Sequence, residues 1–106
     1  MPKKRSLFTE VTPIGYRVTL TRDRWKEIVR FKHPALAEHV NEVRACLRNP
    51  EVIRESVKDS DTHLYYRTVE RGFVCVVVGG QIPDRRFVIT AYFTKEIKKG
   101  TALWTK

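Results

Sequence analysis

Polar side chains in the strand-forming part of this chain have the chemistry needed to bind a phosphate and to move a proton. The candidates are two arginines, two tyrosines, a serine and a threonine: Arg54, Ser56, Tyr65, Arg67, Thr90 and Tyr92. An arginine presents paired N–H donors to phosphate oxygens, and a histidine or tyrosine can give or take a proton. His33 at a helix junction and Lys98 in a C-terminal turn can approach the same place. We therefore predict that these groups form one polar cradle.

The alternation of side chains along a strand assigns these residues to a face. An antiparallel meander is predicted by three runs rich in β-branched and aromatic residues, at 63–69, 73–79 and 86–93. In the third run, the set expected to meet the helices is Phe87, Ile89, Ala91 and Phe93. The set expected to face away from them is Val88, Thr90 and Tyr92.

Arg67 decides the face predicted for the first strand of the meander. An unpaired arginine inside a core costs several kcal/mol, so we predict that Arg67 and Tyr65 lie on the face of the sheet that points away from the helices, the open face. Arg54 and Ser56 join them if residues 52–57 form a paired strand. The central run is apolar on both faces and is expected to contribute packing only.

Each candidate also has an ordinary structural role. Tyr65 can be a packing residue with a satisfied hydroxyl, and Thr90 is a typical strand residue. Arg67 can form a surface ion pair with a nearby glutamate, and His33 can be a helix cap. The grouping of these residues, and no single one of them, favours a functional site. The two other histidines are assigned to the surface: His39 and His63.

The order of the predicted elements indicates the fold class. We predict an edge strand at 16–20, a helix at 21–31, a helix at 34–48, a strand at 52–57, the meander, a turn at 95–99 and an extended tail at 101–104. Thr21 is the predicted N-cap of the first helix and Gly100 the predicted stop of the last turn. Helices that precede a contiguous antiparallel sheet are typical of an α+β domain.

The predicted architecture is a short N-terminal strand and two helices packed on one face of a roughly three- to four-stranded antiparallel sheet. Residues 14–106 would form this single domain. Residues 1–13, which are basic and contain two prolines, are predicted to be a flexible arm.

The chain is strongly basic, with 21 Lys and Arg against 12 Asp and Glu, a formal net charge of +9 over 106 residues. This excess favours a polyanionic partner, most often nucleic acid, although charge can also simply keep a small domain in solution. Cys46 and Cys75 lie among apolar neighbours and are predicted to be buried and reduced, which favours a cytoplasmic location. No apolar run of about 18 residues occurs, so no membrane span is predicted.

Several motifs of metal- and nucleotide-dependent enzymes are absent from the sequence. It contains no zinc-binding spacing of the CxxC or HExxH type, no glycine-rich phosphate loop and no G-x-S-x-G nucleophile turn. We therefore predict no metal and no cofactor. A metal-free reaction on a phosphodiester remains open.

Short motifs along most of the chain resemble a known family. They are His33-Pro34, Asn49-Pro50, the run from Leu64 to Arg67, the run from Val76 to Val78, and the stretch from Thr90 to Gly100. With the order strand, helix, helix, sheet, these motifs resemble the phage-associated branch of the barnase–EndoU–colicin–RelE nuclease superfamily. The resemblance covers about residues 15–104 and implies a RelE/barnase-like fold.

The resemblance implies a metal-independent endoribonuclease, a toxin or phage effector, that cuts RNA by attack of its own 2′-hydroxyl on the phosphate. Arg54 and Arg67 would stabilise the charged phosphorane, and His33 or Tyr92 would act as general base or acid. The remaining candidates would bind substrate: Ser56 and Thr90 the phosphate oxygens, Lys98 the rim of the site and Tyr65 a base by stacking. An acidic antitoxin or immunity protein is the implied protein partner.

Two other functions fit the same features. One is a non-catalytic nucleic-acid-binding module, which would bind RNA or DNA in a salt-sensitive way without cleaving it. The other is an interaction module whose partner is an acidic antitoxin-like protein, because the charge of +9 suits such a partner as well as RNA.

Overall fold

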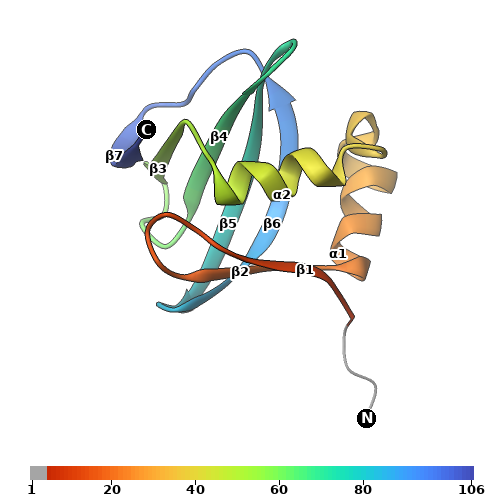
Figure 1. The fold of residues 1–106 in the computed structure, drawn as a ribbon, viewed down its shortest axis with the longest axis horizontal. Helices are drawn as coiled ribbons and strands as arrows, with labels where there is room; N and C mark the ends of the chain where they lie inside the picture. Colours follow the sequence, from red (N-terminus) through yellow and green to blue (C-terminus); the bar gives the residue numbers. More distant parts are fainter. Residues whose placement is uncertain (1–4) are drawn as a thin grey trace.

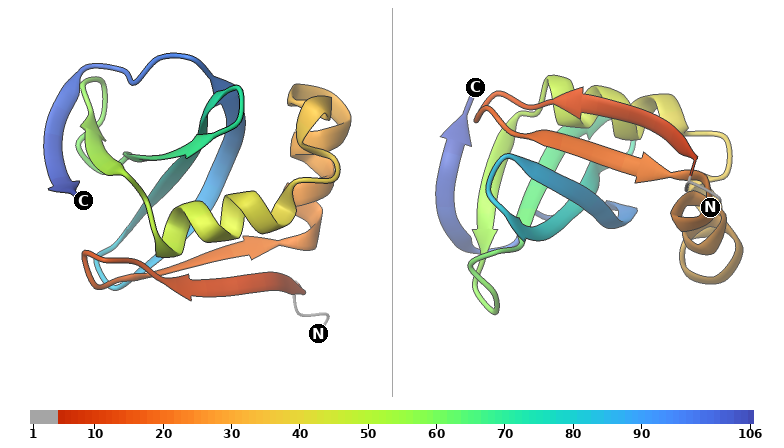
Figure 2. Two further views of the ribbon diagram at one scale, coloured as in Figure 1. Left: turned by 45° about the horizontal axis from the view of Figure 1, so that its top comes forward. Right: turned by 90° about the horizontal axis from the view of Figure 1, so that it is seen from below.

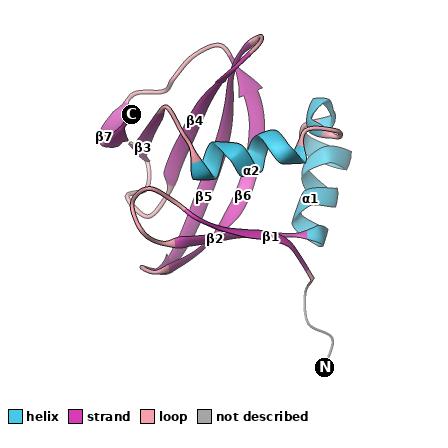
Figure 3. Ribbon diagram, in the orientation of Figure 1, coloured by secondary structure: helices cyan, strands magenta, loops and turns pink. Residues whose placement is uncertain are grey.

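A computed structural model describes residues 5–106 and consists of one mixed seven-stranded sheet with helices on one face (Figure 1). The strands are β1 (Ser6–Val11), β2 (Arg17–Thr21), β3 (Val52–Ser56), β4 (His63–Val69), β5 (Gly72–Ile82), β6 (Arg85–Thr94) and β7 (Gly100–Thr105). The helical segments are α1 (Arg22–Glu27), η1 (Ile28–Lys32), η2 (Pro34–Leu36) and α2 (Val40–Arg48). The distribution of helix and strand is shown in Figure 3.

The strands lie side by side in the order β1-β2-β6-β5-β4-β3-β7. Every neighbouring pair is antiparallel except β2 and β6, which run parallel. The helices that connect β2 to β3 allow this crossover, and α2 lies across β4 and β5 (Figures 1 and 2). The predicted α+β class, the two helices and the antiparallel meander β4-β5-β6 are therefore confirmed.

The sheet is larger than predicted, because both ends of the chain add an edge strand. The predicted arm at residues 1–13 contains β1, so its description as a flexible arm is wrong for Ser6–Val11. Residues 1–4 lie outside the described residues. In β1, Phe8 and Glu10 are buried in alternation with exposed neighbours, which is the pattern of a half-buried strand. The predicted C-terminal tail forms β7, which pairs with β3.

Glu10 ties β1 to the helix layer. Its carboxylate accepts a hydrogen bond from Nε of Arg44, and Nε of Arg48 lies 3.9 Å away, both on α2. Glu10 is 9% exposed, so burial of its charge requires these cationic partners. Glu10 therefore fixes β1 to α2 through its charge.

The first helix begins with an ordinary N-cap but ends in an irregular turn. The Thr21 side chain accepts a hydrogen bond from the Arg24 N–H at 3.2 Å, which confirms the predicted N-cap. Beyond Glu27 the helix widens into the π-helical turn η1, whose last bond runs from the His33 N–H to the Ile28 carbonyl at 2.7 Å. This turn sets the position of His33.

The second predicted helix, 34–48, is wrong in its first part. Pro34 starts only the short 3-10 segment η2, and the regular helix α2 begins at Val40. Val43 and Leu47 of α2 are buried in the core together with Leu36. No helix in the described part of the chain is long and apolar enough to cross a membrane.

The turn after β6 is also only partly as predicted. The Thr94 hydroxyl accepts a hydrogen bond from the Glu96 N–H at 3.2 Å, as expected for a capped turn. Gly100 does not stop this turn and instead begins β7. A Cβ atom at Gly100 would collide with the backbone carbonyl oxygen of Glu55 on β3, so the close approach of the two strands requires glycine there.

Apolar side chains pack on both faces of the sheet. The larger core lies between the sheet and the helices and contains Ile28, Leu36, Val43, Leu47, Ile53, Val74, Val76, Val78, Val88 and Ala91. Burial of each large aliphatic side chain contributes about 1.5–3 kcal/mol. A smaller cluster lies on the opposite face, which we call the open face, and contains Val52, Leu64, Tyr66 and Cys75. The two cysteines are free and buried, as predicted.

Candidate functional site

A β-bulge in β6 decides which of its residues face outward. Val77 on β5 pairs with Thr90, but the next residue, Val78, pairs with Val88, so Ile89 is an extra residue in β6. The alternation of faces is therefore interrupted. Val88 and Ala91 both enter the core on the helix face.

Because of the bulge, three of the seven face assignments predicted for β6 are wrong. Phe87 and Ile89 were predicted to meet the helices, and Val88 to face away, and these three assignments are wrong. Ala91 and Phe93 do pack against the core on the helix face, as predicted. Thr90 and Tyr92 lie on the open face, also as predicted, where they line one cavity.

The face predicted for Tyr65 and Arg67 on β4 is wrong. Tyr65 is fully buried on the helix face and donates a hydrogen bond to the Tyr16 hydroxyl at 2.7 Å, so it cannot stack on a base. Nη1 of Arg67 donates to the backbone carbonyl of Asn49 at 2.7 Å, at the C-terminal end of α2. A helix C-terminus leaves carbonyls without partners and attracts cations, so the guanidinium is satisfied there without entering the core.

The other predicted residues do meet on the open face, and we call Arg54, Ser56, Thr90, Tyr92 and Lys98 the open-face cluster. Ser56, Thr90, Tyr92 and Lys98 line a single cavity of about 350 Å³. Nη1 of Arg54 donates to the backbone carbonyl of Lys98 at 3.1 Å. The prediction that β3 is a paired strand with Arg54 and Ser56 on the open face is thereby confirmed.

The segment between β6 and β7 crosses the open face and brings Lys98 to the cluster. The Lys98 N–H donates to the Tyr66 hydroxyl at 3.1 Å, and Ile97 packs against the apolar cluster beneath it. The Lys98 ammonium lies 5.9 Å from the centre of the Tyr92 ring, a cation–π distance. Lys98 is therefore anchored through its backbone and keeps its ammonium group beside the cavity.

His33 reaches the cluster from the helix layer. Its ring centre lies 5.4 Å from that of Tyr92, with the two planes inclined by 37°. Its side chain makes no capping hydrogen bond to η2, so the alternative role of a cap is not observed. The predicted approach of His33 to the strand residues is confirmed.

The cavity has a positive lining. Three lysines border it, Lys58, Lys98 and Lys99, and none of the carboxylates among residues 5–106 does. Two of the buried polar atoms that lack a hydrogen-bond partner within the described residues belong to the cluster: Nε of Arg54 and Oγ1 of Thr90. Of these two, Thr90 lines the cavity, so its hydroxyl is the one that a group bound there could contact.

Burial changes the proton chemistry of the tyrosines in this region. Desolvation, and secondarily the neighbouring Cys75 thiol, raises the pKa of Tyr92 well above its ordinary value. Desolvation also raises the pKa of Tyr66 to about 12. Both hydroxyls are therefore protonated at neutral pH, and Tyr92 can donate a proton but cannot take one.

A second polar network lies on the helix face. The Tyr16 hydroxyl is 2.8 Å from Nδ1 of His63 and accepts from Tyr65, while the Arg86 guanidinium lies 4.7 Å from the centre of the Tyr16 ring. His63 is 8% exposed, so its predicted surface position is wrong. Burial, and then the charge of Arg86, lowers the pKa of His63. The network is closed to solvent and its hydroxyls are paired.

Sequence reasoning missed some members of the cavity although a signal was present. Lys58 has the same strand phase as Arg54 and Ser56, and Lys99 follows Lys98 directly. Tyr66 also lies on the open face, where its hydroxyl accepts a hydrogen bond from the Lys98 N–H. It was missed because Arg67, its neighbour on the opposite side of β4, was predicted to lie on that face. Among residues 5–106, no group of three or more His, Cys, Asp or Glu side chains is arranged to hold a metal ion.

Comparison with known proteins found no matching family model, no matching curated protein and no matching solved structure.

Proposed function

We propose that this protein is a metal-independent endoribonuclease and that the open-face cluster holds the phosphate to be cleaved. The observation that carries the proposal is the lining of the cluster's cavity. The lining combines three lysines with Thr90, whose buried Oγ1 has no partner among residues 5–106, and Arg54 lies beside it with Nη1 on the Lys98 carbonyl. A phosphate in this cavity can accept a hydrogen bond from Thr90 and balance the positive charge of the lysines.

The geometry supports a role for each residue. Arg54 and the lysines would stabilise the negative charge of the phosphorane, because preorganised cations act most strongly where charge develops. Ser56 and Thr90 would donate to phosphate oxygens. His33 would take the proton from the attacking 2′-hydroxyl. Tyr92, which is protonated at neutral pH, would give a proton to the leaving 5′-oxygen as its bond to phosphorus breaks.

Kinship with the phage-associated branch of the barnase–EndoU–colicin–RelE superfamily belongs to this proposal. It is supported by the succession of β2, two helical segments and the meander, and by the position of His33 beside Tyr92. The proposal excludes Arg67 and Tyr65 from the reaction, because both lie on the helix face. A cytoplasmic location is part of it and agrees with two free, buried cysteines.

The test is incubation of the purified protein with single-stranded RNA in EDTA, followed by analysis of the products for 2′,3′-cyclic phosphate ends. Arg54→Ala should lower the cleavage rate by about 100-fold, the usual effect of removing one group that stabilises a charged transition state. Arg67→Ala is the matched control and should leave the rate per folded molecule unchanged. RNA that stays intact where a barnase control cuts it would contradict the proposal.

A second candidate is a module that binds RNA without cleaving it. It is favoured by the position of Arg67, since only Arg54, of the two arginines predicted to stabilise the transition state, lies on the open face. Such a module would show salt-sensitive RNA binding and no cyclic-phosphate products. An acidic antitoxin-like protein is the protein partner that fits the same lysine-lined cavity.

A further inference from the structure

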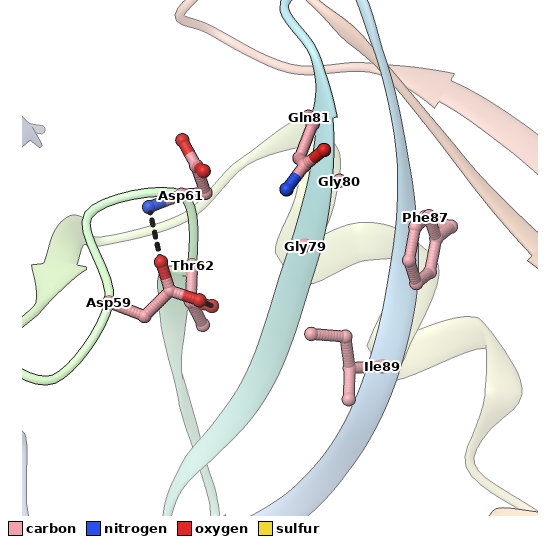
Figure 4. Close-up of a pocket in the computed structure, with 8 residues that line it drawn as sticks. All are labelled: Asp59, Asp61, Thr62, Gly79, Gly80, Gln81, Phe87 and Ile89. Atoms are coloured by element: carbon pink, nitrogen blue, oxygen red, sulfur yellow. Dashed lines mark hydrogen bonds between the residues drawn. The ribbon is translucent and has the colours of Figure 1, made fainter.

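A second cavity lies on the open face next to the first, where β5 and β6 meet the β3–β4 loop. It measures about 430 Å³, within the size range of small-ligand sites. Figure 4 shows its lining, which consists of Asp59, Asp61, Thr62, Gly79, Gly80, Gln81, Phe87 and Ile89. Thr62 borders both cavities, so a ligand in the open-face cluster can extend directly into this one.

Phe87 forms an exposed aromatic wall of this second cavity. It lies on a strand of the sheet, yet 46% of its surface is accessible, because the bulge at Ile89 turns it away from the core. Bulges often re-aim a side chain next to a functional site. An exposed aromatic ring beside a basic cavity is the usual platform on which single-stranded nucleic acids stack a base.

Two glycines of β5 lie beneath side chains of β6 in this cavity. A Cβ atom at Gly79 would collide with the Ile89 side chain, and one at Gly80 would lie 3.4 Å from the Phe87 ring. Gly80 also has φ +127°, a conformation that other residues rarely adopt. The glycines therefore allow the Ile89 and Phe87 side chains to pack closely onto β5, which fixes the position of the Phe87 ring.

Asp61 places a free carboxylate on the wall opposite Phe87 (Figure 4). Its N–H donates to Oδ1 of Asp59 at 2.9 Å, and its carbonyl accepts from Nη1 of Arg86 at 2.8 Å, so its backbone is fixed. The carboxylate itself makes no hydrogen bond or ion pair with any residue in 5–106. The Asp59 carboxylate, by contrast, is used by Asp61 and Thr62.

We propose that this second cavity is a base-binding subsite for single-stranded RNA whose phosphate lies in the open-face cluster. The inference rests on the proposed function and deepens it by defining the substrate. Phe87 stacks on a base that is splayed out of the strand, as in most sequence-specific RNA recognition. Asp61 accepts N–H groups from the pairing edge of that base.

This chemistry implies a base preference. A carboxylate is an acceptor only, so it favours bases that present an exocyclic amino group, namely adenine, cytosine and guanine. Uracil presents two carbonyl oxygens on either side of one N–H, and these oxygens would face the carboxylate. The subsite should therefore discriminate against uracil.

The test uses fluorescently labelled single-stranded 2′-O-methyl oligonucleotides of A, C or U, which lack the attacking hydroxyl and report binding without cleavage. Phe87→Ala should weaken binding roughly tenfold, the loss typical of one stacked base, and Phe87→Tyr should restore it. Ile82→Ala is the matched control, because Ile82 is 48% exposed but does not line the cavity. Asp61→Asn should abolish the preference against U, and Asp23→Asn, on the surface of α1, should not.

The outcomes separate this inference from the proposed function. If natural RNA is cleaved but Phe87→Ala and Asp61→Asn bind all three oligonucleotides as the controls do, the subsite is overturned and the ribonuclease stands. If the oligonucleotides bind with the expected preference but natural RNA stays intact, the subsite is supported and the nuclease proposal is overturned. If no oligonucleotide binds, the subsite is overturned.

Discussion

The two faces of the sheet carry similar polar residues in opposite states. On the helix face, Tyr16, Tyr65 and His63 form a closed network in which hydroxyls and imidazole satisfy one another. On the open face, Tyr92 lines a lysine-bordered cavity, and the His33 ring approaches the Tyr92 ring from the helix layer. The presence of tyrosine and histidine therefore does not by itself mark a functional site. Unpaired polar atoms do not distinguish the faces either, because Nε of Arg86 in the helix-face network also lacks a hydrogen-bond partner within residues 5–106. The lysine-lined cavity is what distinguishes the open face.

The largest effect that would sharpen this comparison is expected at Tyr92. Tyr92→Phe removes the proposed proton donor and should lower RNA cleavage by about 100-fold or more, the usual contribution of general acid catalysis. Its effect on stability should be about 1 kcal/mol or less, because the residue is only partly buried. Single-turnover cleavage in EDTA and urea unfolding measure the two quantities. Unchanged cleavage would remove the functional difference between the faces.

The converse effect is expected at Tyr16 on the helix face. Tyr16→Phe leaves the Tyr65 hydroxyl and Nδ1 of His63 without their partner in a buried place. Each unpaired group costs about 1–3 kcal/mol, so the free energy of unfolding should fall by roughly 2–6 kcal/mol. Cleavage per folded molecule should not change. A variant that unfolds like wild type but no longer cuts RNA would place the site on the wrong face.

A smaller effect is expected from acid, and it should act on the helix face. Burial and the Arg86 charge hold the pKa of His63 below its ordinary value of 6.5, so the folded state favours the neutral imidazole. The stability contributed by His63 is therefore complete above about pH 6.5 and is lost as the pH falls through the lowered pKa. A protonated Nδ1 can no longer accept a hydrogen bond from Tyr16.

Urea midpoints between about pH 7.5 and about pH 5 measure this dependence. His63→Gln should reduce the slope in this range, whereas His39→Gln should keep it, since His39 pairs with Glu42 outside both networks. A midpoint that rises on acidification, or a slope that survives His63→Gln, would show that the network does not control the acid response.

Much of the fold was predictable, because local patterns carried it. The three runs of the meander, the N-cap Thr21 and the short strand before it follow from β-propensity and capping chemistry. The edge strands β1 and β7 were not recognised, because their patterns are short and their partners lie far away in the sequence. Hydrogen bonding to a neighbouring strand, rather than local β-propensity, makes these two segments strands.

The candidate site was predictable only in part, because two arguments failed for physical reasons. Arg67 was placed on the open face since a buried arginine is costly, but it lies near the end of β4 and satisfies its guanidinium on the end of α2. Strict alternation was assumed for β6, but one extra residue at Ile89 reverses the phase upstream of it. No local composition signals either event.

Local sequence patterns identify the strands of the meander, and they show which residues share a face within β3 and within the regular parts of β4 and β6. Alternation divides a strand into two sets because successive side chains point in opposite directions. Which of the two sets of side chains meets the helices depends on where α2 ends and on where the bulge in β6 falls, and both are settled by tertiary packing. The open-face cluster exists because residues from β3, β6 and the β6–β7 segment converge there, a convergence that depends on long-range packing.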